Sequence, residues 1–330
     1  MNLTMGKVYT LNEATKSEHG KELYDFRNII RKPLDPNKVE LHLTDSTFQM
    51  TPELQSEVDK AWEETLKKNP NAFDAPKLRF ESLEMEGGNL IVNVSDKISY
   101  AKHNVIRNKK GLPLMSYPTP VTINALQETV DGYLLFGQRD PKGSDQSDCA
   151  VVGAGFHDVP KMKGEVLYEG DLFATALKEA REETEYMTLF DTAIKTAIRE
   201  TEYGVTSQDV PVKFPIDKPN AKVITFVRGT NTDVTMGYHF PLTVLAEQVN
   251  LNRKNREFKE MIKIRNSSSN LEQILGQNGQ LKGAMSDKGT IDGNYVLADH
   301  AIGLVEAYRN IREFSNRLGT SLLKMHYVHN

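Results

Sequence analysis

The sequence predicts an α/β domain preceded by a smaller α+β region. Three observations point to this fold. Short apolar runs alternate with helical stretches after residue 118, and the first ~117 residues contain their own strand and helix patterns. The chain of 330 residues, 38% hydrophobic and 26% charged, is long enough for one large domain or two ordinary ones. Because no low-complexity linker separates the regions, we expect residues 1–117 to pack on residues 118–330.

The N-terminal region contains one predicted helix among predicted strands. Residues 39–44 alternate apolar and polar side chains, which indicates a strand. Residues 51–66 begin with a threonine and a proline, as a capped helix does. Two further strands are predicted at 78–83 and 90–95, and Gly87-Gly88 between them predicts a hairpin turn.

The C-terminal region begins with a predicted hairpin of two apolar runs, 121–126 and 132–137. A short strand at 150–152 leads into Gly153-Ala-Gly155, and two helical stretches occupy residues 171 to about 203. The remaining predicted elements are strands at 223–227 and 238–244, helices at 271–275 and 299–318, and a long loop within 266–291.

Composition excludes several classes of function. A net charge of −4 and a pI near 6.1 give no electrostatic basis for binding nucleic acid or a membrane surface. The single cysteine, Cys149, permits neither an intrachain disulfide nor a cysteine-cluster metal site. The polar N-terminus lacks the apolar core of a signal peptide, and no segment has ~20 consecutive apolar residues. We therefore expect a cytoplasmic protein.

A tandem repeat is the clearest internal feature. Residues 172–186 read LFATALKEAREETEY and residues 189–203 read LFDTAIKTAIRETEY, with ten of fifteen aligned positions identical. Both copies keep an apolar helical stripe, which the first copy forms from Phe173, Leu177, Ala180 and Thr184. The sequence therefore predicts two similar helices, and the second could form an interface between copies in a homo-oligomer.

Only the first copy carries a cluster of acids. Glu179, Glu182 and Glu183 are spaced i, i+3 and i+4, which places their carboxylates on one helix face. The second copy has Thr196 and Arg199 at the first two of these positions. An acidic face can simply be solvated. Three neighbouring carboxylates can instead bind Mg²⁺ or Mn²⁺, both of which prefer oxygen ligands.

This segment resembles the Nudix hydrolase box, G-x5-E-x7-R-E-U-x-E-E-x-G-U, where U is aliphatic. Lys178-Glu-Ala-Arg-Glu-Glu183 aligns with its second half, and Gly164 falls on the opening glycine. The resemblance covers residues ~118–250 and implies an α/β/α sandwich with a mixed sheet. The N-terminal extension, including 61–80, and the helix entry Asp171-Leu-Phe173 resemble the branch of animal UDP-glucose/UDP-galactose diphosphatases.

Three box positions depart from the family pattern: Lys178 replaces arginine, Gly170 stands where the upstream glutamate belongs, and Glu185 replaces glycine. An alternative register would use Glu200 and Glu202, but residues spaced i, i+2 face apart on a helix.

The resemblance also implies a catalytic arrangement. Glu182 and Glu183 would hold a divalent ion, Glu179 would be a third ligand or orient them, and Lys178 would replace the box arginine in holding a glutamate. The expected contacts to substrate come from the glycine turn and its surroundings: Arg139, Gly153, Gly155 and His157. Arg139 could equally form a surface ion pair, and His157 could simply be solvated.

Two functions follow from these patterns. The first is hydrolysis, dependent on Mg²⁺ or Mn²⁺, of a diphosphate linkage in a small nucleoside diphosphate derivative, with a UDP-sugar favoured. The second is a catalytically weakened Nudix-like module that binds a nucleotide or a protein, which the three departures from the box favour.

Overall fold

A computed structural model gives the fold. It describes residues 7–9, 15–16, 24–25, 32–68, 70, 76–99, 119–139, 149–156, 172–186, 220–228, 234–252 and 257–328. The second copy of the repeat, residues 189–203, lies outside these ranges, as do His157, Gly164 and Gly170. The described helices include none that is long and apolar enough to span a membrane.

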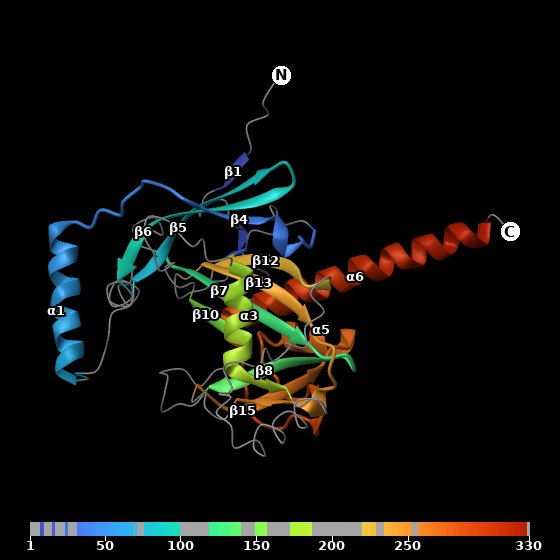
Figure 1. Cartoon of the computed structure of the whole chain (residues 1–330). Helices are drawn as coiled ribbons and strands as arrows, with labels where there is room; N and C mark the ends of the chain where they lie inside the picture. The colour runs from blue at the N-terminus through green and yellow to red at the C-terminus, as the bar shows by residue number, and fades with distance from the viewer. Residues whose placement is uncertain are drawn as a thin grey trace, which may run out of the picture.

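The N-terminal region forms a four-stranded sheet in the described part of the chain, with α1 (Pro52–Lys68) beside it (Figure 1). The sheet's strands, in spatial order, are β1 (Lys7–Tyr9), β5 (Pro76–Glu86), β6 (Asn89–Ser99) and β4 (Val39–Leu43). β5 and β6 form the predicted hairpin, and both turn glycines, Gly87 and Gly88, have positive φ angles of 58° and 89°. The expected helix and hairpin are thereby confirmed.

A larger mixed sheet lies at the centre of the described part of the C-terminal region. Its centre is the strand order β15 (Phe258–Arg265), β8 (Tyr133–Arg139), β7 (Val121–Glu128), β13 (Val234–Pro241) and β12 (Lys222–Arg228). β7 and β13 are parallel, whereas β12 with β13 and β8 with β15 are antiparallel. Short strands extend or flank this sheet: β2 (Thr15–Lys16), β3 (Tyr24–Asp25), β9 (Cys149–Val151), β10 (Ala154–Phe156), β16 (Met285–Ser286) and β17 (Gly289–Thr290).

Helices cover both faces of the central sheet. On one face, α3 (Leu172–Glu183) buries Leu172, Ala176 and Ala180 in a core shared with β7, β12 and β13. On the other face, α5 (Ser268–Gly276) and the long α6 (Asp299–Val328) pack in a second core (Figure 1). The predicted α/β/α sandwich with a mixed sheet is confirmed. Neighbouring residues of β12 enter opposite cores, Val223 the one beneath α3 and Ile224 the one beneath α5 and α6.

The two sheets share apolar contacts. Phe80 of β5 and Phe226 of β12 have ring centroids 5.2 Å apart, and both are buried in the core beneath α3. The Phe80 amide also donates to the Thr119 carbonyl oxygen at 2.7 Å. The N-terminal hairpin therefore packs directly against the larger sheet, although the domain boundary at residue 117 remains a prediction.

Two local predictions were wrong. The first repeat copy was expected to be helical to residue 186, but α3 ends at Glu183, and β11 (Thr184–Tyr186) then pairs with β14 (Val249–Leu251). Thr184 turns its hydroxyl to the Ala180 carbonyl oxygen, and this β-branched residue starts a strand because a partner strand is present. The sequence analysis also missed β15, whose short pattern of alternation follows a charged segment.

The remaining short elements complete the chain in the described ranges. One turn of 3₁₀ helix, Pro36–Lys38, begins at the capping Asp35, and another, Ala246–Gln248, precedes β14. The region 266–291, expected to be a long loop, contains α5, whose N-cap Ser267 accepts a hydrogen bond from the Asn270 amide. The predicted helix at 271–275 is therefore part of a longer one.

Candidate functional site

The candidate site lies where α3 crosses the glycine turn that links β9 to β10. Gly153 has φ = +107°, a conformation that strongly favours glycine. A Cβ atom added to Gly153 would lie 3.1 Å from the Ala180 Cβ, so the missing side chain also lets α3 approach the turn. Sequence and packing together therefore bring the acidic end of the helix to this turn.

Glu183 is the buried acid of the site, with 2% of its surface exposed. Its Oε2 accepts a hydrogen bond from the Gly153 backbone amide. Burial raises the pKa of Glu183 to about 9, the nearby Glu257 and Glu179 carboxylates add to this, and the amides of Gly153 and Ala154 oppose it. At neutral pH without a bound cation, this carboxyl group is therefore protonated.

Glu179 lies one turn before Glu183 and faces the same glycine turn. A Cβ atom added to Gly155 would lie 2.7 Å from both the Cγ and the Oε2 atoms of Glu179. Real Cβ atoms essentially never come this close to another heavy atom, so Glu179 occupies the space that a side chain at residue 155 would need. Lys178 Nζ lies 3.7 Å from Glu179 Oε1, the contact expected if this lysine holds a glutamate. The Lys178 ammonium group makes this contact as a single charge, without the bidentate geometry of an arginine guanidinium.

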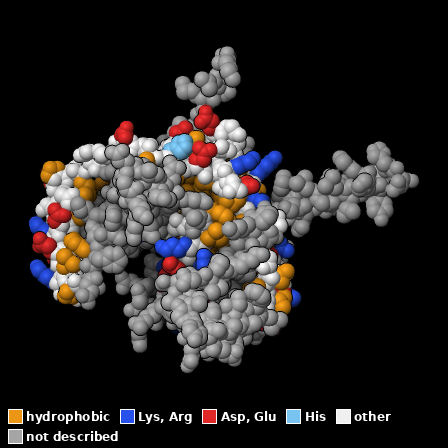
Figure 2. Space-filling view, in the orientation of Figure 1, with side chains coloured by type: hydrophobic (Ala, Val, Ile, Leu, Met, Phe, Trp, Pro, Cys, Tyr) orange, Lys and Arg blue, Asp and Glu red, His pale blue; other side chains and the backbone are white. Residues whose placement is uncertain are grey.

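Glu182 occupies a different environment from its two neighbours. It is exposed, as are Lys178 and Arg181, whereas Glu179 is half-buried and Glu183 is buried. Basic and acidic side chains lie together over α3 near the centre of Figure 2. The structure therefore brings Glu179 and Glu183 to the glycine turn and leaves Glu182 at the solvent side.

Glu257 is an acid of this site that the sequence analysis did not find. It immediately precedes β15, and its charge is the largest electrostatic influence on the Glu183 carboxyl group. Arg139, at the end of β8, places its Nε 3.4 Å from Glu257 Oε1. Arg139, predicted as a substrate ligand, is thus beside the acid cluster and in an ion pair. The alternation of Phe258, Ile262 and Ile264 was the available signal for the strand that positions Glu257.

The backbone after α3 is held by the strand that precedes Glu257. β11 pairs with β14, and the Asn252 amide donates to the Glu183 carbonyl oxygen at 2.9 Å. β14 is followed, after a short interval, by Glu257 and β15. The end of the acidic helix is therefore tied to β14, and Glu257 is placed separately by the pairing of β15 with β8.

The donor chemistry of the cluster fits a divalent cation bound by carboxylates. Burial and the charges of Glu257 and Glu179 both disfavour ionisation of Glu183, and a bound dication would favour its ionised form. Within the described residues, no three or more His, Cys, Asp or Glu side chains are already gathered around one point. A preformed cage is not required for Mg²⁺, which usually keeps several waters and takes only one or two carboxylates.

Comparisons with known proteins give distant structural similarity only. No protein-family model and no curated protein matches the chain. Two structures of a bifunctional NMN adenylyltransferase/ADP-ribose pyrophosphatase from Francisella tularensis are similar to it. One, complexed with AMP and a manganese ion, has 16% identity and a TM-score of 0.30, and the match covers 61% of this chain and 42% of that one.

The other Francisella tularensis structure has 14% identity and a TM-score of 0.32, and the match covers 66% of this chain and 48% of that one. This chain thus spans less than half the length of either Francisella chain. A Deinococcus radiodurans protein has 13% identity and a TM-score of 0.30, with 65% of this chain and 93% of that one covered.

Proposed function

We propose that the protein is a Nudix-type hydrolase that uses Mg²⁺ or Mn²⁺ to cleave a diphosphate linkage in a nucleoside diphosphate derivative. The observation that carries this proposal is that two acids of one helix meet the glycine turn. Glu183 accepts a hydrogen bond from the Gly153 amide, and Glu179 lies against Gly155. A buried carboxyl group that is costly to ionise is a feature of functional sites more often than of helix surfaces. Its place in the Nudix-like pattern of the sequence supports the same assignment.

Each residue of the proposed site would have its own role in binding the metal. Glu179 and Glu183 would hold the metal, with Glu257 completing the acid cluster and Glu182 approaching from the solvent side. When bound, the ion would offset charge on the phosphate oxygens and lower the pKa of a water molecule. The Gly153 amide would keep the Glu183 carboxylate oriented, and the missing side chain at Gly155 would leave space for Glu179.

The substrate class follows from charge and from the sequence pattern. Arg139, beside Glu257, would exchange its ion pair for a phosphate oxygen, because a guanidinium binds phosphate in a bidentate fashion. The backbone of the turn at Gly153 and Gly155 would face the diphosphate, although the space left by the two missing side chains is itself taken by Ala180 and Glu179 of α3. His157 would contact the diphosphate from the following segment. We propose a UDP-sugar as the substrate, on the basis of the N-terminal extension.

The direct test is an assay of the full chain with UDP-glucose, UDP-galactose, ADP-ribose and dinucleoside polyphosphates. Release of a nucleoside monophosphate would be followed with Mg²⁺, with Mn²⁺ and with a chelator. We expect turnover of at least one substrate that depends on the metal, with UDP-sugars preferred. Turnover of ADP-ribose alone would overturn the UDP-sugar assignment, and no turnover of any substrate would overturn the hydrolase itself.

The second candidate function is a Nudix-like module that binds a nucleotide or a protein without hydrolysing it. The exposed position of Glu182 and the contact of Lys178 with Glu179 favour this alternative, because both weaken a three-glutamate metal site. Binding of UDP-glucose in the presence of Mg²⁺ without product formation would be the result that supports it.

A further inference from the structure

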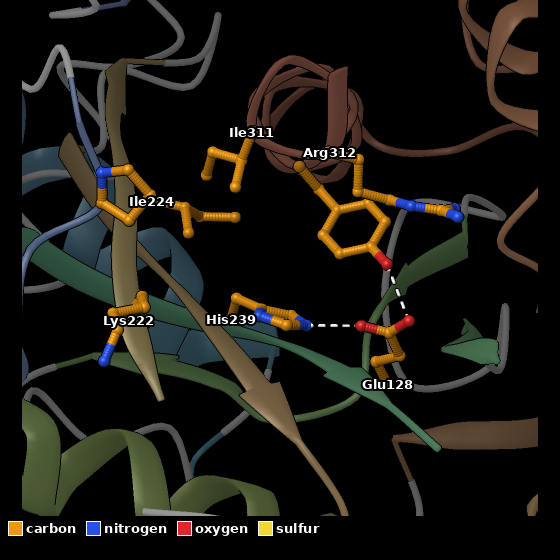
Figure 3. A pocket seen from close by; sticks show the side chains of 8 residues that line it. Glu128, Lys222, Ile224, His239, Ile311 and Arg312 are labelled. Carbon is orange, nitrogen blue, oxygen red and sulfur yellow. Dashed lines mark hydrogen bonds and ion pairs between the residues drawn. The ribbon is translucent and has the colours of Figure 1, made fainter. Parts of the chain in front are cut away.

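Gln127 is a buried amide side chain beside the candidate site. It lies near the end of β7, and none of its surface is exposed. Successive side chains of a strand point to opposite faces of the sheet. The next residue, Glu128, faces α6, where it accepts hydrogen bonds from His239 and Tyr308 (Figure 3). Gln127 therefore faces α3 and the glycine turn.

The Gln127 side chain forms a hydrogen bond with the glycine turn. A buried carboxamide is costly unless its polar atoms are hydrogen-bonded. Gln127 Nε2 donates to the Val152 carbonyl oxygen at 2.6 Å. Val152 is itself fully buried and directly precedes Gly153 in the chain. The hydrogen bond therefore joins the centre of the large sheet to the turn on which the acids of α3 converge.

The peptide group that Gln127 contacts is the one that contacts Glu183. The Val152 carbonyl oxygen and the Gly153 amide belong to a single planar, trans peptide group, so they point in opposite directions. Gln127 binds the oxygen end, and the N–H end donates to Glu183 Oε2. Because a hydrogen bond to the oxygen polarises the peptide group, it also strengthens the N–H group as a donor. Gln127 is thus linked to Glu183 through one rigid unit.

The next peptide group of the turn is held in a parallel way. Its oxygen, the Gly153 carbonyl, accepts a hydrogen bond from the Ala125 amide of β7 at 3.0 Å. Burial raises the pKa of Glu183, and the Ala154 amide at the other end of this group opposes that rise, as the Gly153 amide does. Both peptide groups that favour the Glu183 carboxylate are therefore held from β7. The Ala125 bond is main chain, so a substitution can remove only the bond from Gln127.

We propose that Gln127 is a positioning residue for metal binding: it fixes the Val152–Gly153 peptide group, which in turn fixes the Glu183 carboxylate. Removing a group that orients a metal ligand typically costs about 10- to 100-fold in metal affinity or activity. The effect on catalysis rests on the proposed hydrolase function. The restraint on the peptide group can be measured in metal-free protein, so the two can fail separately.

Hydrogen exchange in the metal-free full chain tests the restraint on the turn. Gln127→Met removes the donor but keeps an unbranched side chain. We expect the Gly153 amide to exchange about tenfold or more faster in this variant. The reference is the Val234 amide, which donates to the Pro120 carbonyl oxygen in the same sheet and reports unfolding of the sheet as a whole. A Gly153-to-Val234 ratio of exchange rates equal to that of the wild type would overturn the proposal.

Mn²⁺ binding and steady-state hydrolysis test the consequence for the site. We expect Gln127→Met to weaken Mn²⁺ binding, measured by titration calorimetry, and to lower kcat, each by about tenfold or more. KM for the substrate should stay within about twofold, because the lost interaction orients a metal ligand and does not bind the substrate. Wild-type Mn²⁺ affinity in a folded Gln127→Met variant would overturn the positioning role, even if hydrogen exchange at Gly153 had changed.

Asn270→Leu is the matched control. Asn270 is also a buried carboxamide, and its Nδ2 donates to the carbonyl oxygens of Arg265 and Met285 at 2.9 and 3.0 Å. It lies on α5, on the opposite face of the central sheet from α3. Asn270→Leu should lower the melting temperature but leave the Gly153 exchange ratio, Mn²⁺ binding and kcat unchanged. Equal losses in both variants would mean that Gln127 acts only by stabilising the fold, which would contradict the proposal.

The outcomes separate the role of Gln127 from the proposed function. If the wild type hydrolyses no substrate but binds Mn²⁺, the hydrolase fails, and hydrogen exchange and Mn²⁺ affinity still decide the role of Gln127. If the wild type also binds no Mn²⁺, the positioning role fails with it. If the wild type hydrolyses a substrate and Gln127→Met equals it in kcat and Mn²⁺ affinity, the hydrolase stands and the positioning role alone fails.

Discussion

Glu183 connects burial, electrostatics and the proposed chemistry at the level of a single residue. Its carboxyl group is buried next to two other acids, and its pKa is raised to about 9. In the folded protein it therefore keeps its proton in a range of pH where the unfolded chain, with a value near 4.5, has lost it. Because the folded state binds more protons between these values, the free energy of unfolding falls as pH rises from about 4.5 to 9.

Glu183→Gln should remove this pH dependence in the metal-free protein. Each pH unit within the window costs the wild type up to about 1.4 kcal/mol, whereas a neutral amide carries no such cost. We expect Glu183→Gln to raise the melting temperature at pH 8 by about 5 °C and to change it little at pH 5. Thermal unfolding with a chelator measures this. Equal melting temperatures for the two proteins at pH 8 would mean that Glu183 is not buried as described.

The contribution of Glu128 to the free energy of unfolding should depend on pH in the opposite direction. Its folded-state pKa is lowered, so its stabilising contribution is complete above the ordinary value of 4.5 and disappears as pH falls through the lowered value. Its carboxylate accepts hydrogen bonds from His239, Tyr308 and Asn266, all partly buried. Glu128→Gln should reduce the free energy of unfolding by about 1–3 kcal/mol at pH 6, because one of these donors loses its acceptor. Urea unfolding at pH 6 and pH 3 should show the difference shrinking at the lower pH. A constant difference would contradict this account of the network.

At the level of elements, the site depends on how closely α3 approaches the glycine turn. Gly153 and Gly155 are two residues apart, and each removes a side chain where α3 would otherwise collide. The strand, the turn glycines and the acidic helix were all predictable, because their patterns are local. Glu257 was not, because it precedes β15, which reaches the site by pairing with β8, a strand far away in the sequence.

The end of α3 also could not be predicted from local sequence patterns. Helical periodicity continues through Thr184 to Tyr186, but tertiary strand pairing overrides it there. The predicted apolar stripe does face the core, with Ala180 buried and Phe173 and Leu177 packed against it, but Leu172 and Ala176 are also fully part of that core. Local patterns thus located the helix and its acids, whereas the end of the helix and the last acid required long-range contacts.

Gly155→Ala should test the proximity of the turn and the helix. The added methyl group would displace Glu179, and we expect hydrolysis to fall by about 100-fold with a destabilisation of about 1–3 kcal/mol. Gly276→Ala, at the end of α5, is the control, because a Cβ added there meets no atom within 4 Å. Steady-state rates and urea unfolding of both variants give the comparison. A Gly155→Ala enzyme as active as Gly276→Ala would show that Glu179 need not occupy its observed position.

At the scale of the whole molecule, one sheet separates two different chemical environments. The α3 face gathers carboxylates, which suit a cation, and the α6 face has a hollow lined by both apolar and charged side chains. The N-terminal hairpin joins the core beneath α3, so we expect it to support the face on which the proposed site lies. Patterning predicted an α/β domain, and the resemblance to the Nudix box implied the sandwich, but no local pattern reports the contacts between α6 and the strands beneath it.

Metal binding should therefore stabilise the entire fold through the α3 face. A ligand that binds only the native state raises stability by RT ln(1 + [L]/Kd), which is about 2.7 kcal/mol at 100 times Kd. Saturating Mg²⁺ should raise the melting temperature of the wild type at pH 8, and chelation should reverse the rise. Glu183→Gln should show little of this effect. An equal rise in both proteins would indicate that the ion binds elsewhere.

The central claim is that Glu183 takes part in metal-dependent diphosphate hydrolysis, and one comparison tests it most directly. Initial rates of monophosphate release from the best substrate are measured with Mg²⁺ for the wild type, Glu183→Gln and Glu272→Gln, whose acid is exposed on α5. We predict a loss of about 100-fold or more for Glu183→Gln and no change for Glu272→Gln. Wild-type rates in a folded Glu183→Gln variant would contradict the assignment of the site.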